Sequence, residues 1–395
     1  MIYADNAATT KPSQKVIDAM VACLSEDYGN PSSVYTLGQR AAELLQDARA
    51  RVAKNLGCDP SEITFTSGGS EADNQAIRTA AFLGAQKGKK HLISTPFEHH
   101  AVLHTLNKLE REGFEVTYLD VHENGLVVPE ELAQAIRPDT ALVSIMFANN
   151  EIGTIQPVAE IGAICREKGV LFHCDSVQAI GHVPVNVYDL KIDFLALSAH
   201  KFHGPKGVGV LYTKKGIRLQ NLIEGGAQER GKRAGTENVP GIVGMAVAMD
   251  DAIANLDKQA KYVAPLRDKL IDGLSKIPHS ILNGDRTQRL PGNVNFCFEG
   301  IEGESLLLLL DNEGICASSG SACTSGSLDP SHVLLSIGRP HEIAHGSLRL
   351  TISEETTPEE VDTLIKAVTE AVEYLRSISP VWRNLQEGKQ DFIIQ

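Results

Sequence analysis

Short apolar runs alternate with amphipathic helical patterns over the first 240 residues, and this alternation restricts the chain to few folds. Most of the runs are dense in Val, Ile and Leu, which indicates strands that are covered on both faces. Strands separated by helices favour a mostly parallel sheet with helices on either side. We therefore predict an α/β domain built on a mostly parallel seven-stranded sheet. The predicted strands are 63–66, 91–95, 115–121, 141–148, 170–174, 194–198 and 208–213.

The intervening segments carry the period of an α-helix. The first of them, 14–28, places five apolar residues on one face, and Gly57 stands where a helix over 36–56 would end. The five apolar residues are Val16, Ile17, Met20, Val21 and Leu24. Further helices are predicted over 70–88, 99–112 and 158–168.

The pattern changes after about residue 240. One long helix is predicted over 240–276. The last helix begins with a capping box formed by Thr357 and Glu360, with Pro358 in its first turn. We predict a large domain over 15–260 and a smaller α+β domain over 261–395 that includes 1–14 and carries the loop 315–327. The other elements expected in the small domain are 293–298, 303–312 and 347–353.

Composition excludes several classes of protein. The 37 Lys and Arg against 50 Asp and Glu give a net charge of −13, so we expect no nucleic-acid partner. The longest strongly apolar run, 306–310, is too short to span a bilayer, and the first residues lack the apolar core of a signal peptide. Seven cysteines without a CxxC pair argue against a disulfide framework. We therefore expect no membrane partner and a cytoplasmic location.

An acid and a lysine follow two of the predicted strands. Asp175 comes just after 170–174, and Lys201 comes just after 194–198. In open α/β sheets ligands bind at the carboxyl ends of strands. A lysine that can form a Schiff base and an acid that can pair with a protonated pyridine nitrogen are the two anchors of a pyridoxal 5′-phosphate (PLP) site. The alternative is that both side chains are simply solvated or paired in salt bridges.

The stretch "TSGGSEADN" offers a place for a phosphate group. The glycines of Ser67-Gly68-Gly69 let backbone N–H groups approach an anion, and a helix opens at Ser70. A well-capped helix after a turn would have the same sequence. The chain has no GxxxxGK[ST] motif and no GxGxxG between a strand and a helix, so a dinucleotide-binding dehydrogenase is poorly supported.

Three histidines gather in "PFEHHAVLH". His100 and His104 stand four residues apart on a predicted helix, but no third ligand accompanies them, so we expect no metal site. His99, at the start of that helix, is a candidate for stacking on an aromatic cofactor or for proton transfer.

The segment "ICASSGSACTSGS", 315–327, consists of small residues around the thiol of Cys323. Such a stretch cannot build a core, and Gly320 and Gly326 on either side of the thiol give it conformational freedom. By residue type alone, an inert or a metal-binding role for Cys323 stays open.

Nine motifs taken in order resemble one family. The chain is similar to the cysteine desulfurases of the NifS/IscS type, which belong to the class V aminotransferase group of fold-type I PLP enzymes. The resemblance covers residues 2 to about 375. The motifs are "YADNAATT", "YGNPSS", "FTSGGSEADN", "EHHAV", "NNEIG", "HCDSVQ", "SAHKFHGPKG", "RAGTEN" and "SSGSACTSG".

The resemblance assigns roles to the candidate residues. It implies that Lys201 holds PLP covalently, that Asp175 pairs with the pyridine nitrogen, that Gln178 bonds the phenolic oxygen and that His99 stacks on the ring. It implies a phosphate site made of Gly69, Ser70, Ser198 and His200.

The resemblance also implies a homodimer with shared active sites, in which Thr236 and Arg233 reach the phosphate bound by the neighbouring subunit. Asn150, counted with the cofactor contacts as well, and Arg349 would receive the substrate. Arg349 would bind its carboxylate through two hydrogen bonds.

By the same resemblance, the reaction removes sulfur from L-cysteine and leaves L-alanine. The Cys323 thiolate would take the sulfur as a persulfide and pass it to an acceptor protein such as an iron–sulfur scaffold. An iron–sulfur contact of Cys323 shared with that scaffold stays open, and no other metal is expected. Because Cys323 must meet the substrate and then an outside acceptor, we expect weak order over 318–327. The alternatives are a selenocysteine lyase, another class V PLP aminotransferase, or a sulfur-relay partner without catalysis.

Three stretches differ from the common pattern of that family. "GGS" stands where many relatives have Gly-Ala-Thr, which keeps a hydroxyl at Ser70, and "GAQER" replaces a glycine-rich form. The tail "WRNLQEGKQDFIIQ" does not match the housekeeping enzymes, so docking of a scaffold through that tail is not inferred.

Overall fold

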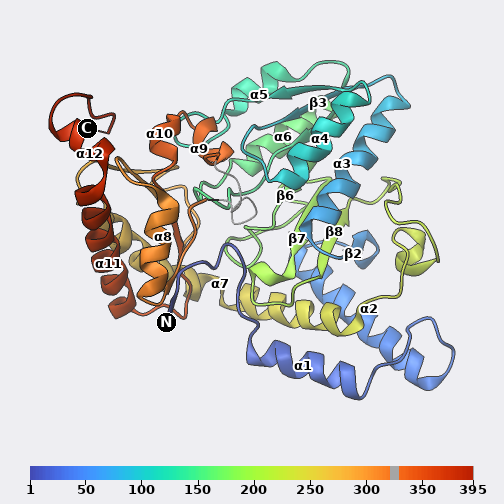
Figure 1. Ribbon diagram of the computed structural model, residues 1–395. Coiled ribbons are helices and arrows are strands. Elements are labelled where there is room, and N and C mark those ends of the chain that lie inside the picture. The colour runs from blue at the N-terminus through green and yellow to red at the C-terminus, as the bar shows by residue number, and fades with distance from the viewer. Residues whose placement is uncertain (321–328, 395) are drawn as a thin grey trace.

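A computed structural model describes residues 1–320 and 329–394 of the chain. The large domain is built around a seven-stranded sheet in the order β2-β8-β7-β6-β5-β3-β4 (Figure 1). β8 runs antiparallel to both β2 and β7, and the other neighbouring pairs are parallel, as predicted. The strands are β2 (Ile63–Thr66), β3 (His91–Ser94), β4 (Glu115–Tyr118), β5 (Thr140–Ser144), β6 (Leu171–Asp175), β7 (Phe194–Ser198) and β8 (Gly209–Thr213).

Both faces of this sheet are covered by helices. On β7, Leu195 and Leu197 belong to one apolar core, and Phe194 and Ala196 belong to a second core on the opposite face. This two-sided burial explains why the strands are uniformly apolar. The second core lies under α3 (Gly69–Ala85) and α4 (His100–Arg111). Helices that contribute to the first core are α1 (Gln14–Ser25), α2 (Thr36–Leu56), α5 (Pro129–Ala135) and α6 (Val158–Lys168).

Several predicted boundaries are reproduced by the structure. β2, β7, α2 and α6 have the predicted bounds, and Gly57 ends α2 with a φ of 72°, a conformation that favours glycine. β5 is shorter than the predicted 141–148, because the backbone N–H of Met146 turns to the buried Glu98 carboxyl instead of a neighbouring strand.

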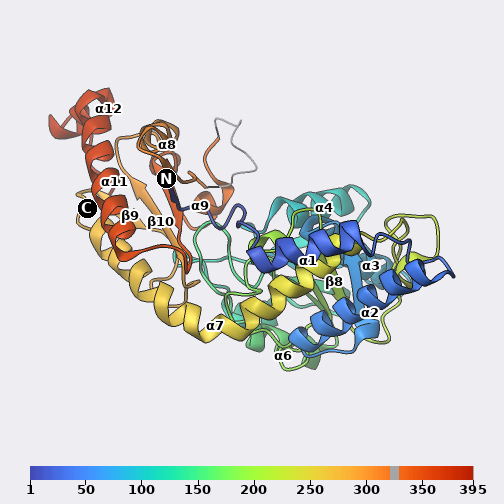
Figure 2. The ribbon, with the colours of Figure 1, turned by 90° about the horizontal axis from the view of Figure 1, so that it is seen from below.

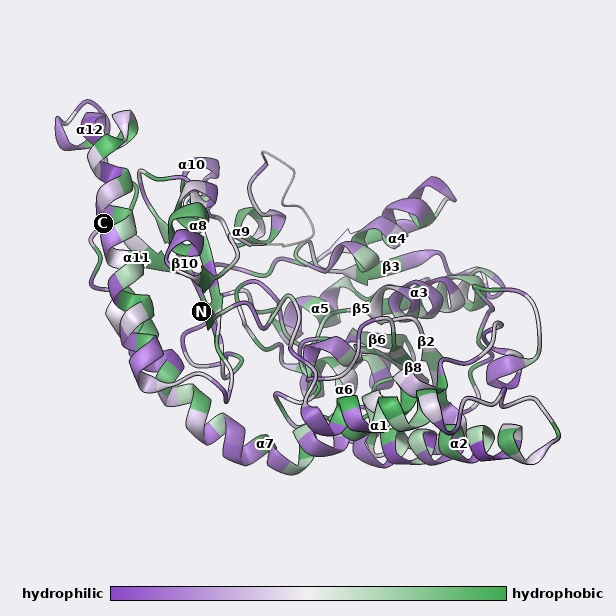
Figure 3. Cartoon of the chain, turned by 60° about the horizontal axis from the view of Figure 1, so that its bottom comes forward, coloured by the Kyte–Doolittle hydropathy of each residue, from purple (hydrophilic) through white to green (hydrophobic). Residues whose placement is uncertain are grey.

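The small domain contains an antiparallel sheet in the order β12-β10-β9. β10 (Asn293–Phe298), β12 (Ser347–Thr351) and β9 (Ser280–Leu282) pack against α8 (Gly303–Asn312) and α11 (Pro358–Ile378) around a separate core. The Thr357 capping box predicted for α11 is present. Figure 3 shows a largely hydrophobic β10, whereas the helices carry hydrophobic and hydrophilic residues in turn. Shorter elements are β1 (Ile2–Tyr3), β11 (Ile315–Cys316), α9 (His332–Ser336), α10 (His341–Ala344) and α12 (Pro380–Gln386), together with single 3-10 turns at Pro60–Glu62, Ala199–Lys201 and Gln228–Gly231.

One helix, α7 (Val239–Leu274), contributes to both domains (Figure 2). Its first half, through Ala252, belongs to the core of the large domain, and Val263 begins the part that belongs to the small domain. The predicted boundary between the two domains, at residue 260, therefore falls inside a continuous helix. The division into two domains at this residue stays a proposal. Among helices in the described part of the chain, α7 alone is long and apolar enough to cross a membrane, and 56% of the qualifying window is buried inside the protein.

The N-terminal segment also connects the two domains. β1 pairs in parallel with β11 of the small domain, and the N–H of Thr10 then donates to the carbonyl of His200 in the large domain at 2.9 Å. Figures 1 and 2 show the segment passing between the domains before α1 begins.

A buried ion pair fixes the loop that precedes α7. The Arg49 guanidinium donates two hydrogen bonds to the Glu229 carboxylate, at 2.7 and 2.8 Å, and both side chains are 3% exposed. Arg49 also donates to the carbonyl of Ile63, and Glu229 accepts from the N–H of Phe65, so the loop is attached to β2. Glu229 lies in "GAQER", one of the stretches that differ from the common pattern, with a φ of 48°.

We expect Arg49→Met to lower the free energy of unfolding by about 3–5 kcal/mol, because it leaves the buried Glu229 carboxylate without its cation. Urea unfolding of the purified protein measures this change. Arg51→Met, which removes a partly exposed pair with Asp250, is the control and should cost no more than about 1 kcal/mol. Equal losses in the two variants would contradict the role given to Arg49.

Candidate active site

A cavity of about 620 Å³ lies at the carboxyl ends of β6 and β7, beside the first turn of α3. This is the position at which open α/β sheets bind ligands. The structure brings ten of the predicted residues to its wall: Gly69, Ser70, His99, Asn150, Asp175, Gln178, Ser198, His200, Lys201 and Arg349. Arg233 and Thr236 are not among the lining residues, and Cys323 lies outside the described residues.

Lys201 is positioned by the turn that follows β7. Its ammonium group donates to the carbonyls of Ala7 and Ala8, at 2.7 and 2.8 Å. The ring of His182 contacts the backbone carbonyl oxygen of Lys201 at 3.1 Å and so helps to fix this turn. The amine is therefore held within the cavity by the N-terminal segment.

Asp175 ends β6 on the face of the sheet that α3 covers. The side chain is buried and accepts a hydrogen bond from the N–H of Val177 at 3.0 Å. Burial raises the pKa of Asp175 to about 6, and the positive charge of Lys201 opposes that rise. Asp175 is thus mostly ionised at neutral pH and can pair with a protonated ring nitrogen.

Two further buried acids surround Asp175. Burial and the neighbouring acids raise the pKa of Asp73 well above its ordinary value, and burial raises the pKa of Glu98 to about 8. His173 lies between Asp73 and Ser144, at 3.2 and 2.8 Å, and burial lowers its pKa to about 3, so it is neutral. Three carboxylates cannot all carry charge in one low-dielectric site. The negative charge therefore concentrates on Asp175.

His99 caps the N-terminus of α4, as its predicted place at the start of that helix required. Its Nδ1 accepts from the N–H of Ala101 at 3.1 Å, which leaves the proton of the neutral ring on Nε2. Burial, then the charge of Lys201, lowers the pKa of His99 to about 4. A neutral imidazole at the wall of the cavity can stack on a flat ligand or pass a proton. Among the described residues, no group of three or more His, Cys, Asp or Glu side chains is placed to hold a metal ion.

The first turn of α3 has room for an anion. Gly68 has a φ of 153°, and a Cβ at Gly69 would come within 2.6 Å of a methyl group of Val177, so both positions favour glycine. No side chain of the described residues caps the helix at Gly68. Ser198 and His200 line the wall beside this turn, and burial lowers the pKa of His200 to about 4.

Arg233 pairs with Glu71 of the same chain rather than facing the cavity. Its Nε lies 2.9 Å from the Glu71 carboxylate, which sits in the first turn of α3. This pairing neutralises an acid that would otherwise repel a phosphate. Thr236 is exposed. The roles of Arg233 and Thr236 toward a neighbouring subunit stay predictions.

The described residues that flank 321–328 are attached close to the substrate side of the cavity. Ser318 and Arg349 exchange two backbone hydrogen bonds, at 2.6 and 3.2 Å. On the other flank, the hydroxyl of Ser331 donates to the carboxylate of the buried Glu151, the neighbour of Asn150. The expectation of weak order over 318–327 falls largely on residues outside the described part.

The contacts of the N-terminal segment are the part of the site that sequence reasoning missed. The carbonyl of Ala7 accepts from Gln178 as well as from Lys201, Thr9 contacts His200 at 3.2 Å, and Asp5 binds Arg349. "YADNAATT" entered only as a motif of resemblance. These contacts are made largely by backbone carbonyls, which are the same in every residue and so cannot be recognised in a sequence. The position of the segment becomes clear only from the pairing of β1 with β11.

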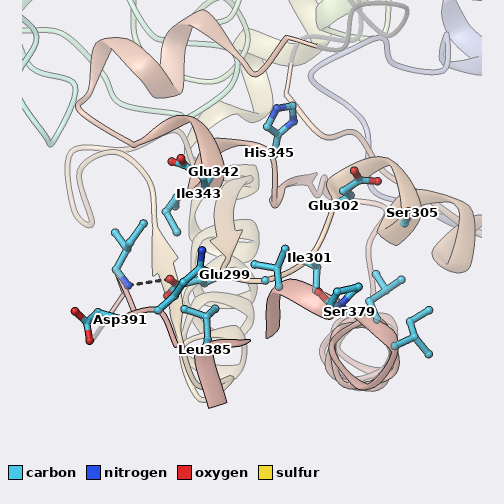
Figure 4. Close-up of a pocket in the computed structure, with 17 residues that line it drawn as sticks. Glu299, Ile301, Glu302, Ser305, Glu342, Ile343, His345, Ser379, Leu385 and Asp391 are labelled. Atoms are coloured by element: carbon cyan, nitrogen blue, oxygen red, sulfur yellow. Dashed lines mark hydrogen bonds between the residues drawn. The ribbon is translucent and has the colours of Figure 1, made fainter. Parts of the chain in front are cut away.

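A second cavity, of about 640 Å³, lies in the small domain and contains none of the predicted residues (Figure 4). The Glu299 carboxylate, labelled there, accepts from the N–H groups of Ile393 and Ile394 at 2.8 and 2.9 Å. The guanidinium of Arg376 stacks over Trp382 at 3.9 Å. This cavity is therefore formed where the C-terminal segment folds back, and the predicted site residues line the first cavity instead.

The first cavity fits PLP. A buried carboxylate can pair with the ring nitrogen of this cofactor, and a lysine amine can bind its aldehyde. A helix N-terminus can bind its phosphate. The neutral ring of His99 is available to the flat face.

Comparisons with known proteins agree with this chemistry. Residues 2–364 match the family described as "Aminotransferase class-V". "Cysteine desulfurase IscS" of Methanosarcina thermophila is 55% identical over 380 residues, 96% of this chain and 94% of that protein. "Cysteine desulfurase IscS" of Clostridium botulinum (strain Hall) is 52% identical over 99% of both chains. A solved structure titled "NIFS-LIKE PROTEIN" is 42% identical, with a TM-score of 0.89 over 95% of this chain and 100% of that one.

The chain belongs to the class V aminotransferase family, whose enzymes use PLP. Within that family it is a cysteine desulfurase of the NifS/IscS type.

We expect Glu98→Gln to change how stability depends on pH. The amide keeps an acceptor for the N–H of Met146 and the hydroxyl of Thr95 but cannot ionise. Burial raises the folded-state pKa of Glu98 to about 8. The stability that its protonated form contributes is therefore complete below the ordinary pKa of a carboxyl group, and it is lost as the pH rises from there through about 8. Urea unfolding over this range should show the parent losing stability relative to the variant. A difference that is constant with pH would contradict the burial of an ionisable Glu98.

Proposed function

We propose that the enzyme takes sulfur from L-cysteine, releases L-alanine and holds the sulfur as a persulfide on Cys323 for a protein acceptor. The observation that carries the proposal is the single cavity in which Lys201, Asp175 and His99 face the buried Arg349. The first three suit a PLP enzyme, and the arginine suits a substrate with a carboxylate. The small-residue segment of Cys323 lies in sequence between two flanks attached beside Arg349 and Asn150.

The residues divide the work of binding the cofactor. When bound, PLP withdraws electrons from the substrate and so weakens its bonds. The Lys201 amine would hold the aldehyde end, and the Asp175 carboxylate would keep a proton on the ring nitrogen. Gln178 would bond the phenolic oxygen. Gly69, Ser70, Ser198 and His200 would hold the phosphate.

Other residues bind the substrate and move protons. Arg349 binds the substrate carboxylate, and Asn150 and Lys201 line the same cavity. The lysine amine removes the Cα proton, and the neutral His99 passes protons between nitrogen and sulfur. The Cys323 thiolate then attacks the substrate sulfur. An S–S bond forms as the Cβ–S bond breaks, and the carbon takes a proton to become the methyl group of L-alanine.

The alternative reactions account for fewer features of the chain. A pure transaminase has no use for Cys323, and the curated relatives carry the name cysteine desulfurase. A sulfur-relay partner without catalysis would not need Lys201 and Asp175 in one cavity. The acceptor is a protein such as an iron–sulfur scaffold, and the reaction takes place in the cytoplasm. The six cysteines in the described part are unpaired thiols, which suits that compartment.

The enzyme acts as a homodimer with shared sites. The rest of the chain covers only part of the apolar stripe predicted on 14–28. Val16 is buried against α7, whereas Ile17, Val21 and Leu24 are exposed. Exposed Tyr28, Val34 and Tyr35 continue this surface through the turn after α1. An uncovered apolar surface of this extent supports burial by a second copy.

Cys323→Ala should keep its bound PLP, with unchanged visible absorbance, but form no persulfide and release no sulfide from L-cysteine under reductant. The thiol is the only group assigned to accept the sulfur. Sulfide release and labelling of protein-bound sulfur measure the loss. Sulfide release at the parent rate would show that the nucleophile is another group.

Lys201→Ala separates the cofactor role from the sulfur role. This variant should lose the absorbance of lysine-bound PLP together with turnover, while its Cys323 remains reactive to alkylating reagents. Full activity without Lys201 would overturn the assignment of the PLP site.

Val21→Glu combined with Leu24→Glu should convert the dimer to a monomer, because the two charges would be buried in the proposed interface. Sedimentation equilibrium measures the mass. Ile378→Glu, at a position of similar exposure on α11, is the control and should leave the dimer intact. A double variant that stays dimeric would place the interface elsewhere.

A further inference from the structure

Arg349, the residue assigned to the substrate carboxylate, already has an acidic partner. The side chain is 2% exposed, and its Nη2 donates to the Asp5 carboxylate at 2.8 Å. Its Nη1 donates to the carbonyl of Asn150 at 3.2 Å. Its Nε is buried and finds no acceptor in the part of the chain that the structure describes. The guanidinium is thus held on two sides and open on one.

Asp5 reaches this arginine from behind the cavity. Arg349 and Asn150 line the cavity wall, whereas Asp5 does not. The backbone of Asp5 is fixed, because its carbonyl accepts from the N–H of Ala8 at 3.0 Å and from the hydroxyl of Tyr3 at 3.2 Å. Asp5 therefore has no direct contact with a ligand in the cavity, and Arg349 lies between them.

A buried guanidinium needs a negative partner when no substrate is bound, since an isolated charge in a protein interior is strongly unfavourable. Asp5 supplies that partner. A substrate carboxylate that arrives at the open side meets a cation whose charge is already shared. Two anions on one cation repel each other, so each binds less tightly than it would alone.

We propose that Asp5 is a positioning residue that weakens the hold of Arg349 on amino-acid carboxylates and so allows the product to leave. This inference rests on the proposed function, in which L-cysteine and L-alanine carry the same carboxylate. Because the reaction changes only the side chain, the carboxylate contact does not weaken when the sulfur is removed. Asp5 lowers the affinity for both ligands and remains the partner of Arg349 after the product has left.

The test is Asp5→Asn in the PLP-loaded enzyme. The amide oxygen keeps the hydrogen bond to Arg349 but removes the competing charge. We expect the inhibition constant of L-alanine and the KM of L-cysteine each to fall on the order of tenfold. Ethylamine, which lacks a carboxylate, should bind parent and variant equally when its binding is followed by PLP absorbance.

The sign of the change separates this role from a structural one. A merely structural Asp5 would raise KM in the variant, because a loosened arginine binds carboxylates less well. Unchanged or weaker inhibition by L-alanine would therefore overturn the proposal. Asp5→Glu, which keeps the charge, should leave both constants within about twofold. If Asp5→Asn folds poorly, Asp5→Ser carries the same expectation.

Two controls keep the interpretation clear. Asp251→Asn removes one unit of charge from an exposed pair with Lys15 and should change neither constant. A parent enzyme that does not desulfurate L-cysteine would defeat the proposed function itself. An active parent whose alanine inhibition is unchanged in Asp5→Asn would defeat only the inference about Asp5.

Discussion

The parallel pairing of β6 with β7 sets the relative position of the two groups on which the proposed chemistry depends. Asp175 lies opposite Ala196, so its carboxylate ends one strand within reach of the turn that carries Lys201 at the end of the next. Helices cover both faces of these strands, and the cavity lies at their carboxyl ends. An acid and an amine that would otherwise form an ordinary salt bridge therefore face a common cavity.

Burial then decides which of these groups carries charge. Asp73, Glu98 and Asp175 lie on the α3 side of the sheet, and burial raises the pKa of all three. The pKa of Asp175 rises only to about 6, because the N–H of Val177 and the charge of Lys201 favour its ionised form. The result is one negative charge under the place expected for the ring nitrogen. The histidines at the wall stay neutral for the same reason, since burial disfavours their protonated form.

Most of the fold was predictable because the spacing of apolar residues along the sequence indicates which side of a helix or strand is buried. β2, α2 and α6 are delimited by clear changes of pattern and have the predicted bounds. The sequence indicated Asp175 and Lys201 because strand ends are marked by the last apolar residue. It did not indicate that Arg233 pairs with Glu71, because a salt bridge between distant residues leaves no local pattern. Nor could it separate the buried side of α1 from its outward side, because both are apolar.

The middle of α7 has a consequence for how the cavity is assembled. Arg349 belongs to the small domain and Lys201 to the large one. Between Ala252 and Val263 no fully buried residue of α7 belongs to either core, and the half-buried Ile253 packs against the core of the large domain. Near the end of that stretch, Gln259 donates to the carboxylate of Glu354 and the hydroxyl of Tyr262 donates to the carbonyl of Thr356. α7, like the N-terminal segment, therefore connects the half of the cavity that contains Arg349 with the half that contains Lys201. A small flexion of one helix would widen or narrow the gap that an amino acid must span.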